Sequence, residues 1–206
     1  PDHMREKLRS LSTKELVSTC ASFRITKASS LSVEQATKIS LRLIAKRIEE
    51  LDTEVRELDA LIDAMTLEIA PTTRSLPQVG PQCAAALILC AGSNPDRLKS
   101  EASFSALCGT SPVPVSSGRT DRHRLSLAGD RQANCAIYLI AIGRMRYSGE
   151  SKDFINKRMA SGKTKKEAIR MLKRYIAREL FHTLRRDLAR LTSETDASNK
   201  PTKIAP

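Results

Sequence analysis

Apolar residues recur through residues 41–69 in strictly alternating steps of three and four, and most positions between them are polar or charged. This spacing predicts one long helix that carries the narrow apolar seam of a four-heptad coiled coil. β-Branched residues fill most of the first core position and Leu recurs in the second, which favours two parallel strands. The nine seam positions are Leu41, Ile44, Ile48, Leu51, Val55, Leu58, Ile62, Met65 and Ile69.

A helix with such a seam needs a partner, which is either a second copy of the chain or the preceding helix folded back along it. We favour self-association through residues 41–69. The coiled-coil helix is expected over residues 31–70, and an N-terminal helix and a linker are expected over residues 1–30.

Pro71 ends the long helix, because proline lacks the amide donor and clashes with the preceding turn. A short helix, a Val79-Gly80 turn and an Ala-rich helix then follow, in the pattern of a helix-hairpin-helix motif. In that motif Gly80 would let the backbone approach a nucleic-acid phosphate. A hairpin with a purely structural role explains the same residues equally well.

Helical periodicity continues over residues 98–107, 131–146, 154–159 and 164–191, so we expect an all-α chain with a helical domain over residues 75–191. Thr164 followed by Glu167 predicts a capping box at the start of the last helix. Residues 192–206 are polar and are expected to form a disordered tail. The apolar stripe of the last helix comprises Ala168, Met171, Leu172, Tyr175, Ile176, Leu180 and Leu184.

Residues 109–130 are rich in Pro, Ser, Gly and Arg and are predicted to form a long basic loop. Irregular segments of this length inside compact domains are usually functional. Ser117 lies in this segment next to a run of arginines, and a serine can attack phosphorus only where cations offset the phosphate charge. Ordinary turn chemistry explains the local Pro, Ser and Gly residues without any catalytic role.

The net charge of +12 is concentrated in residues 115–190, which hold 19 Lys and Arg against 7 Asp and Glu. A surplus confined to one part of the chain indicates a polyanionic partner such as nucleic acid, and a solvated face is the alternative. No apolar run is long enough to span a membrane, so a cytoplasmic, nucleoid-associated protein is expected. Five cysteines without a C-x-x-C pair indicate reduced and mostly buried thiols rather than a metal site.

In this order, the pieces resemble the C-terminal part of a DEDD-type insertion-sequence transposase of the 110/116/902 family, which is related to the Piv invertase. Gln78 stands where the family usually has Gly, and Asp130 stands where it usually has Asn. The landmarks are Leu76-Pro77-Gln78-Val79-Gly80-Pro81, Phe104-Ser105-Ala106-Leu107-Cys108-Gly109-Thr110-Ser111-Pro112 leading to Ser117-Gly118, Arg124-Leu125-Ser126-Leu127-Ala128-Gly129-Asp130-Arg131, and Gly162-Lys163 with its following helix.

The resemblance implies DNA transposition at a composite site. In the family, a ribonuclease-H-like domain binds magnesium through four carboxylates, the C-terminal domain supplies a serine nucleophile, and many members are guided by a bridge RNA. On this chain the serine is Ser117, with Ser116 as the fallback. The predicted nucleic-acid-binding residues are Gly80, Arg119, Arg122, Arg124, Arg131 and Lys163.

Only about 40 residues precede the coiled-coil seam, too few for the carboxylate domain, so a fragment or a truncated copy is expected. No metal site and no cofactor are therefore expected within this chain, and the fragment alone is expected to be inactive. A non-enzymatic helix-hairpin-helix module that binds DNA or RNA and dimerises is the alternative. A basic scaffold that makes only protein contacts is a third hypothesis.

Overall fold

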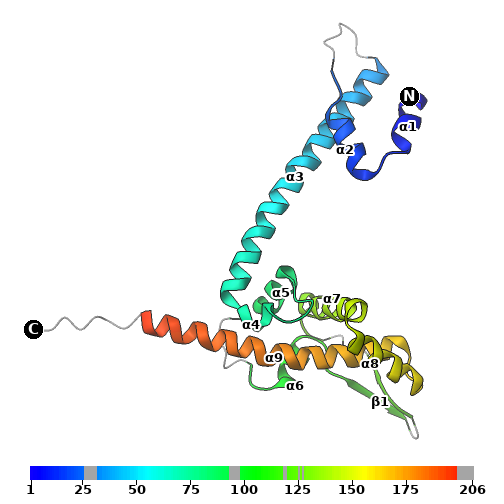
Figure 1. The fold of residues 1–206 in the computed structure, drawn as a ribbon. Helices are drawn as coiled ribbons and strands as arrows, with labels where there is room; N and C mark the ends of the chain where they lie inside the picture. The colour runs from blue at the N-terminus through cyan, green and yellow to red at the C-terminus, as the bar shows by residue number, and fades with distance from the viewer. Residues whose placement is uncertain (26–31, 93–97, 118–119, 125, 127, 199–206) are drawn as a thin grey trace, which may run out of the picture. The chain divides into compact units, whose positions relative to one another are not determined.

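The computed structural model describes residues 1–25, 32–92, 98–117, 120–124, 126 and 128–198. The chain divides into two compact units, Pro1–Ala60 and Leu61–Pro206. Helices dominate both units, so the expected all-α class is confirmed (Figure 1).

The first unit contains α1 (Asp2–Arg9), α2 (Thr13–Ala21) and most of α3 (Val33–Ile69). The sequence predicted a single N-terminal helix, but two are found because Ser12 starts a new one. The Ser12 side chain accepts from the Glu15 backbone, and Glu15 accepts from the Ser12 N–H in return. Met4, Cys20 and Ala45 are the buried apolar residues of this unit.

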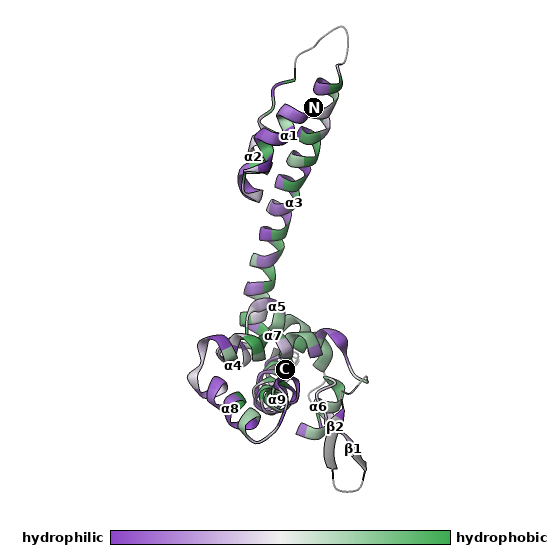
Figure 2. Ribbon diagram, turned by 90° about the vertical axis from the view of Figure 1, so that its right-hand side faces the viewer, coloured by the Kyte–Doolittle hydropathy of each residue, from purple (hydrophilic) through white to green (hydrophobic). Residues whose placement is uncertain are grey.

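Helix α3 is continuous over the predicted seam, and apolar and polar residues alternate along it (Figure 2). Leu41 is partly buried, whereas the middle of the seam is open to solvent. Leu51, Val55 and Leu58 are 42%, 53% and 57% exposed. The two preceding helices therefore leave most of the apolar seam uncovered in the single chain.

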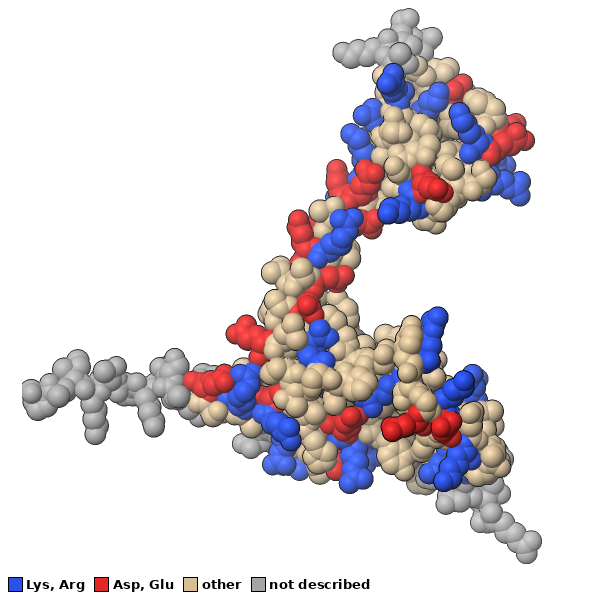
Figure 3. Space-filling view, in the orientation of Figure 1, with Lys and Arg blue, Asp and Glu red and all other residues tan. Residues whose placement is uncertain are grey.

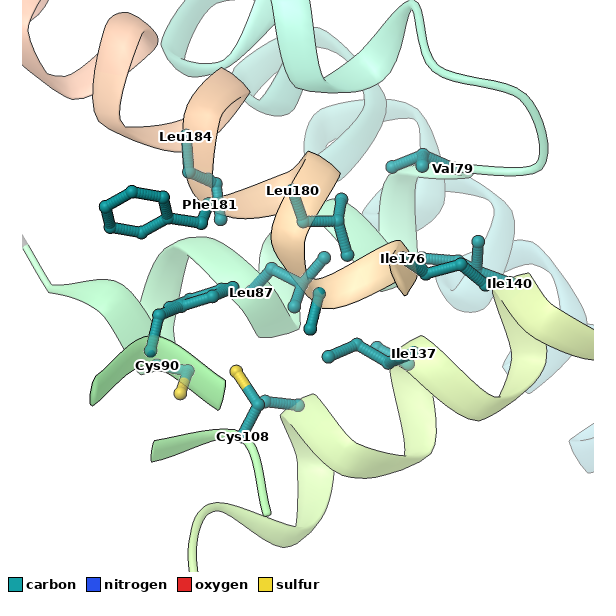
Figure 4. Close-up of a cluster of buried hydrophobic side chains, with 14 of the residues drawn as sticks. Val79, Leu87, Cys90, Cys108, Ile137, Ile140, Ile176, Leu180, Phe181 and Leu184 are labelled. Atoms are coloured by element: carbon teal, nitrogen blue, oxygen red, sulfur yellow. The ribbon is translucent and has the colours of Figure 1, made fainter. Parts of the chain in front are cut away.

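The second unit is built around α9 (Lys165–Ser198). Helices α4 (Pro71–Arg74), α6 (Glu101–Leu107), α7 (Arg131–Tyr147) and α8 (Gly149–Ala160) pack against it, and α5 (Pro81–Ala91) packs against α7. Figure 4 shows the side chains that fill the space between α5, α7 and α9, among them Leu87, Ile137 and Leu180. This core fixes the first turns of α9 relative to α7.

Two polar side chains of α9 fix the end of α3 and the start of α4. Asp187 accepts hydrogen bonds from the Thr72 and Thr73 backbone amides at 3.1 and 2.8 Å and from the Thr73 hydroxyl at 2.8 Å. Arg190 donates to the Glu68 carbonyl at 2.6 Å. Asp187 thus satisfies amides in the first turn of α4 that the helix itself leaves without partners.

Three details differ from the sequence-based expectations. Helix α9 continues to Ser198, beyond Leu191 where its apolar stripe predicts the end. Met171 and Tyr175, which were assigned to that stripe, are not buried in the core. Part of the predicted loop forms an antiparallel hairpin of β1 (Val113–Ser117) and β2 (Thr120–Arg124).

Candidate nucleic-acid interface

Two glycines bring the ends of the hairpin segment together. Gly109 and Gly129 both have positive φ angles, 62° and 99°, which side chains disfavour. A Cβ on Gly109 would lie 2.7 Å from the Ala128 carbonyl oxygen, and one on Gly129 would collide with the Gly109 backbone. The backbones approach so closely only because both residues are glycine, and this contact closes the base of the segment.

Asp130 caps the helix that follows this contact. Its carboxylate accepts from the Ala133 N–H at 2.8 Å, and its own N–H donates to the Leu107 carbonyl at 2.7 Å. Asn and Asp are both good N-cap residues, so the departure from the family pattern keeps the structural role. The exposed residue Arg131 follows as the first residue of α7.

The start of α9 is positioned by a turn and a cap. Gly162 has a φ of 84°, and the N–H of Lys163 donates to the Arg158 carbonyl at 3.2 Å, which closes the end of α8. The Thr164 N–H and hydroxyl both donate to the Glu167 carboxylate at 2.8 Å, and the Glu167 N–H donates back to the hydroxyl at 3.3 Å. The predicted capping box is confirmed.

Between the base of the hairpin segment and the first turns of α9 lies a cavity of about 420 Å³, which we call the basic groove. Among the described residues, five cationic side chains line it, against one carboxylate, that of Glu167. Figure 3 shows Lys and Arg side chains gathered over α8 and α9 of this unit, with fewer Asp and Glu. The lining residues are Gly109, Thr110, Ser111, Pro112, Arg124, Ser126, Lys163, Glu167, Arg170, Met171, Lys173, Arg174 and Tyr175.

Lys173 is the most buried cation of the basic groove, with 6% of the residue exposed. Its Nζ donates to Asn134 Oδ1 at 2.6 Å. Asn134 Nδ2 in turn donates to the carbonyls of Cys108 and Gly109 at 2.9 and 2.8 Å, which fixes the orientation of the amide. Burial lowers the pKa of the Lys173 ammonium, since desolvation disfavours its charged form.

The predicted arginines and serines fall in different places along the hairpin. Arg124 pairs in register with Val113 at the base of the hairpin. Arg124 and Lys163 both line the basic groove. Ser117 pairs with Thr120 at the other end of β1, roughly 13 Å along the strand at 3.3 Å per residue. Ser116 pairs with Asp121 and Val115 with Arg122, whereas Arg119 lies outside the described residues. Arg124 and Ser117 are therefore at opposite ends of the strand pair.

Four residues of the basic groove were missed from the sequence: Arg170, Lys173, Arg174 and Tyr175. The spacing of Arg170, Lys173 and Arg174 on one side of a basic helix was available as a signal, since residues three and four apart in a helix are neighbours. The helical pattern alone does not show which side of α9 the hairpin segment faces.

The turn before α5 has the expected outline of a short helix, a tight turn and a second helix. Gln78 adopts a φ of 64°, the left-handed region that favours glycine. Arg74 stabilises the turn by donating to the Val79 carbonyl at 2.6 Å. Gly80 precedes Pro81 as the N-cap of α5 with ordinary extended backbone, and a Cβ there would meet no atom within 4 Å. Gly80 is not among the residues that line the basic groove.

The described residues were also considered as a membrane-spanning segment and as a metal site, and they fit neither. None of the helices in this part of the chain has the length and apolar character needed to cross a membrane. Across the same residues, His, Cys, Asp and Glu side chains form no group of three that could hold a metal ion. The residues present therefore do not fit the four-carboxylate magnesium site that the family resemblance implies elsewhere.

Comparison with known proteins identifies the second unit. Residues 71–156 match the family described as "Transposase IS116/IS110/IS902 family". The chain is also 30% identical over 147 residues to a Streptomyces coelicolor protein named "Insertion element IS110 uncharacterized 43.6 kDa protein", a match that covers 69% of this chain and 36% of that relative. The chain thus matches only about a third of the relative's length. Residues 71–156 thus carry the transposase domain of the IS116/IS110/IS902 family.

Proposed function

We propose that this chain is the nucleic-acid-binding, dimerising and nucleophile-bearing C-terminal part of a transposase that acts on DNA. The basic groove is the observation that carries the proposal, because five cations converge on a concave surface next to the hairpin that bears Ser117. Cations on a concave surface focus the attraction for a phosphate backbone. The transposase family supports DNA as the partner.

Ser117 is the proposed nucleophile, and Ser116 is the fallback. Arg119, Arg122 and Arg124 belong to the same hairpin segment and would contact the phosphates of the strand that Ser117 attacks. Arg131, Lys163 and Gly80 are proposed as further backbone contacts. For the whole protein, we propose that a carboxylate domain completes the site. A bridge RNA, which many members of the family use, is the proposed guide.

Self-association through α3 is the second part of the proposal. The single chain leaves Leu51, Val55 and Leu58 exposed, and the heptad register makes a second copy of α3 the matching surface. Arg47 is engaged within its own helix by Glu50 and Glu54 at 3.3 and 3.6 Å, so the apolar seam provides the main attraction.

Fluorescence anisotropy with a labelled DNA duplex, titrated at several salt concentrations, tests the nucleic-acid part. We expect affinity to fall steeply with salt, because each neutralised phosphate releases condensed counterions. Replacing Arg119, Arg122 and Arg124 together by Gln should weaken binding to all sequences alike and flatten the salt dependence. Exchange of Lys7, Arg9 and Lys14 for Gln, in the first unit, is the matched control. Unchanged affinity in the hairpin variant would remove the hairpin from the interface.

The same experiments separate the alternatives. A basic scaffold that contacts only proteins would show no salt-sensitive binding to nucleic acid. A non-enzymatic module with the α4-turn-α5 hairpin would bind nucleic acid and would need neither Ser116 nor Ser117 for any activity of the full-length protein.

A further inference from the structure

The lining of the basic groove is of two kinds. Beside its cations it exposes the apolar side chains of Pro112, Met171 and Tyr175. Tyr175 is 51% exposed, and its ring makes an edge contact with the Phe154 ring at a centroid distance of 5.4 Å. Neutralising phosphates requires only charge, whereas an anchored aromatic ring beside cations is the combination that stacks nucleic-acid bases.

One of the cations that line the basic groove, Lys173, is buried. Within the described part of the chain, Lys173 makes no ion pair. Its Nζ donates to the neutral Asn134 amide and lies 5.8 Å from the centroid of the Tyr138 ring, and the Cys108 and Cys135 thiols interact with it electrostatically. Removing an ammonium from water without a counter-charge is unfavourable. A bound phosphate would supply that counter-charge, and the Asn134 hydrogen bonds hold Lys173 in place to receive it.

The size of the basic groove limits its ligand. A cavity of about 420 Å³ is at the small end of the range for small-molecule sites and is too small to enclose a base pair, although the phosphates of a duplex can approach the cations at its rim. One nucleotide, which combines a flat apolar base with an anionic phosphate, matches both the volume and the two kinds of lining side chain.

We propose that the basic groove holds a single unpaired nucleotide, with its base against Tyr175 and Met171 and its phosphate at Lys173. This inference rests on the proposed function, and it adds that the protein distinguishes unpaired from paired nucleic acid. Because Ser117 lies at the far end of the hairpin, the held nucleotide is a neighbour of the attacked phosphate and not its own nucleotide. Its role is to fix the position of the strand.

The test uses the full chain and two DNA duplexes of the same sequence, one fully paired and one with a single bulged 2-aminopurine. We expect about tenfold tighter binding to the bulged duplex, since stacking one base on an aromatic side chain contributes of the order of 1–3 kcal/mol. Binding should also quench 2-aminopurine emission. Tyr175→Leu, which retains an apolar contact with Phe154, should abolish the preference and the quenching, so that the paired and bulged duplexes bind alike.

Tyr147→Leu is the matched control, because Tyr147 is 70% exposed on α7 and does not line the basic groove. The same bulge in an RNA duplex shows whether the nucleotide comes from DNA or from a guide RNA. Equal binding to paired and bulged duplexes, or a preference that persists in Tyr175→Leu, would overturn the inference alone. Failure to bind any of these probes would overturn the proposed function as well.

Discussion

The side chain of Gln78 fills the space beside Gly143, so that a Cβ on this glycine would lie 3.2 Å from Gln78 Cβ and Cγ and 2.7 Å from its Oε1. Gln78 itself has a left-handed backbone, with a φ of 64°. The turn before α5 and the middle of α7 are therefore matched to each other, and neither can change independently.

This relationship predicts that Gly143→Ala changes the stability of the fold in opposite directions in the natural chain and in a Gln78→Gly background. Gly143→Ala in the natural chain should destabilise the fold by about 1 kcal/mol, because overpacking exceeds the gain in helix propensity. In a Gln78→Gly background the same substitution should stabilise the fold by about 1 kcal/mol, since the space is vacated. Urea denaturation of the four variants measures both values, and additive effects would contradict the proposed coupling.

A second prediction concerns the attachment of α3 and α4 to α9. Asp187→Ala should destabilise the second unit by about 3 kcal/mol, because it leaves two amides and a hydroxyl without their charged acceptor. Glu194→Ala, which breaks the exposed pair with Arg190, should change stability by less than about 1 kcal/mol. Thermal denaturation followed by circular dichroism compares them, and a loss of less than about 1 kcal/mol for Asp187→Ala would show that the Asp187 network is not stabilising.

The sequence predicted elements whose pattern is local. The extent of α3 follows from its heptads, and the start of α9 follows from Thr164 and Glu167, because both patterns repeat within a few residues. The β1–β2 hairpin was missed because Pro112, Pro114 and Gly118 read as loop residues, whereas the strands depend on pairing with each other.

The candidate site was predicted only in part for a similar reason. Charge and proximity to Ser117 predict Arg124, and the Gly162-Lys163 landmark of the family resemblance predicts Lys163. Their common cavity, however, depends on the Gly109–Gly129 contact, which joins residues far apart in sequence. Tyr175 fits the helical stripe of α9 and was assigned to the core, although the groove opens at that position. No sequence pattern marks Lys173 as buried, because its environment is created by Asn134 on another helix.

Thiol reactivity gives a third prediction. Burial raises the pKa values of the Cys20 and Cys83 thiols, and a hydrogen bond with Cys90 together with burial raises the pKa of the Cys108 thiol. At neutral pH these thiols therefore hold even less reactive thiolate than an ordinary cysteine. Cys135 is exposed on α7 and should react first with iodoacetamide. Mass spectrometry of the alkylated protein over time measures the order. Modification of Cys20 or Cys108 as fast as Cys135 would contradict the burial of these thiols.

Self-association should depend on the seam of α3. Leu51→Lys combined with Leu58→Lys places charges in the middle of the apolar stripe and should convert a dimer into a monomer at tens of micromolar protein. Thr53→Lys combined with Ala60→Lys adds the same charges on the outer side of the helix and should leave the dimer intact. Light scattering gives the mass of each variant. A monomeric natural chain, or dissociation by both pairs alike, would rule out this interface.

The last prediction separates binding from strand cleavage. A serine hydroxyl is a weak nucleophile near neutral pH, and the described residues provide no carboxylate cluster to assist it. The chain alone should therefore bind DNA without cutting it, with or without magnesium.

In a full-length form that carries the carboxylate domain, Ser117→Ala should abolish recombination and covalent capture of DNA but leave DNA binding unchanged. Ser116→Ala is the matched control and should have a milder effect, since the two residues occupy successive register positions of β1. Recombination that survives Ser117→Ala would refute the nucleophile, and cleavage by the chain alone would refute the composite site.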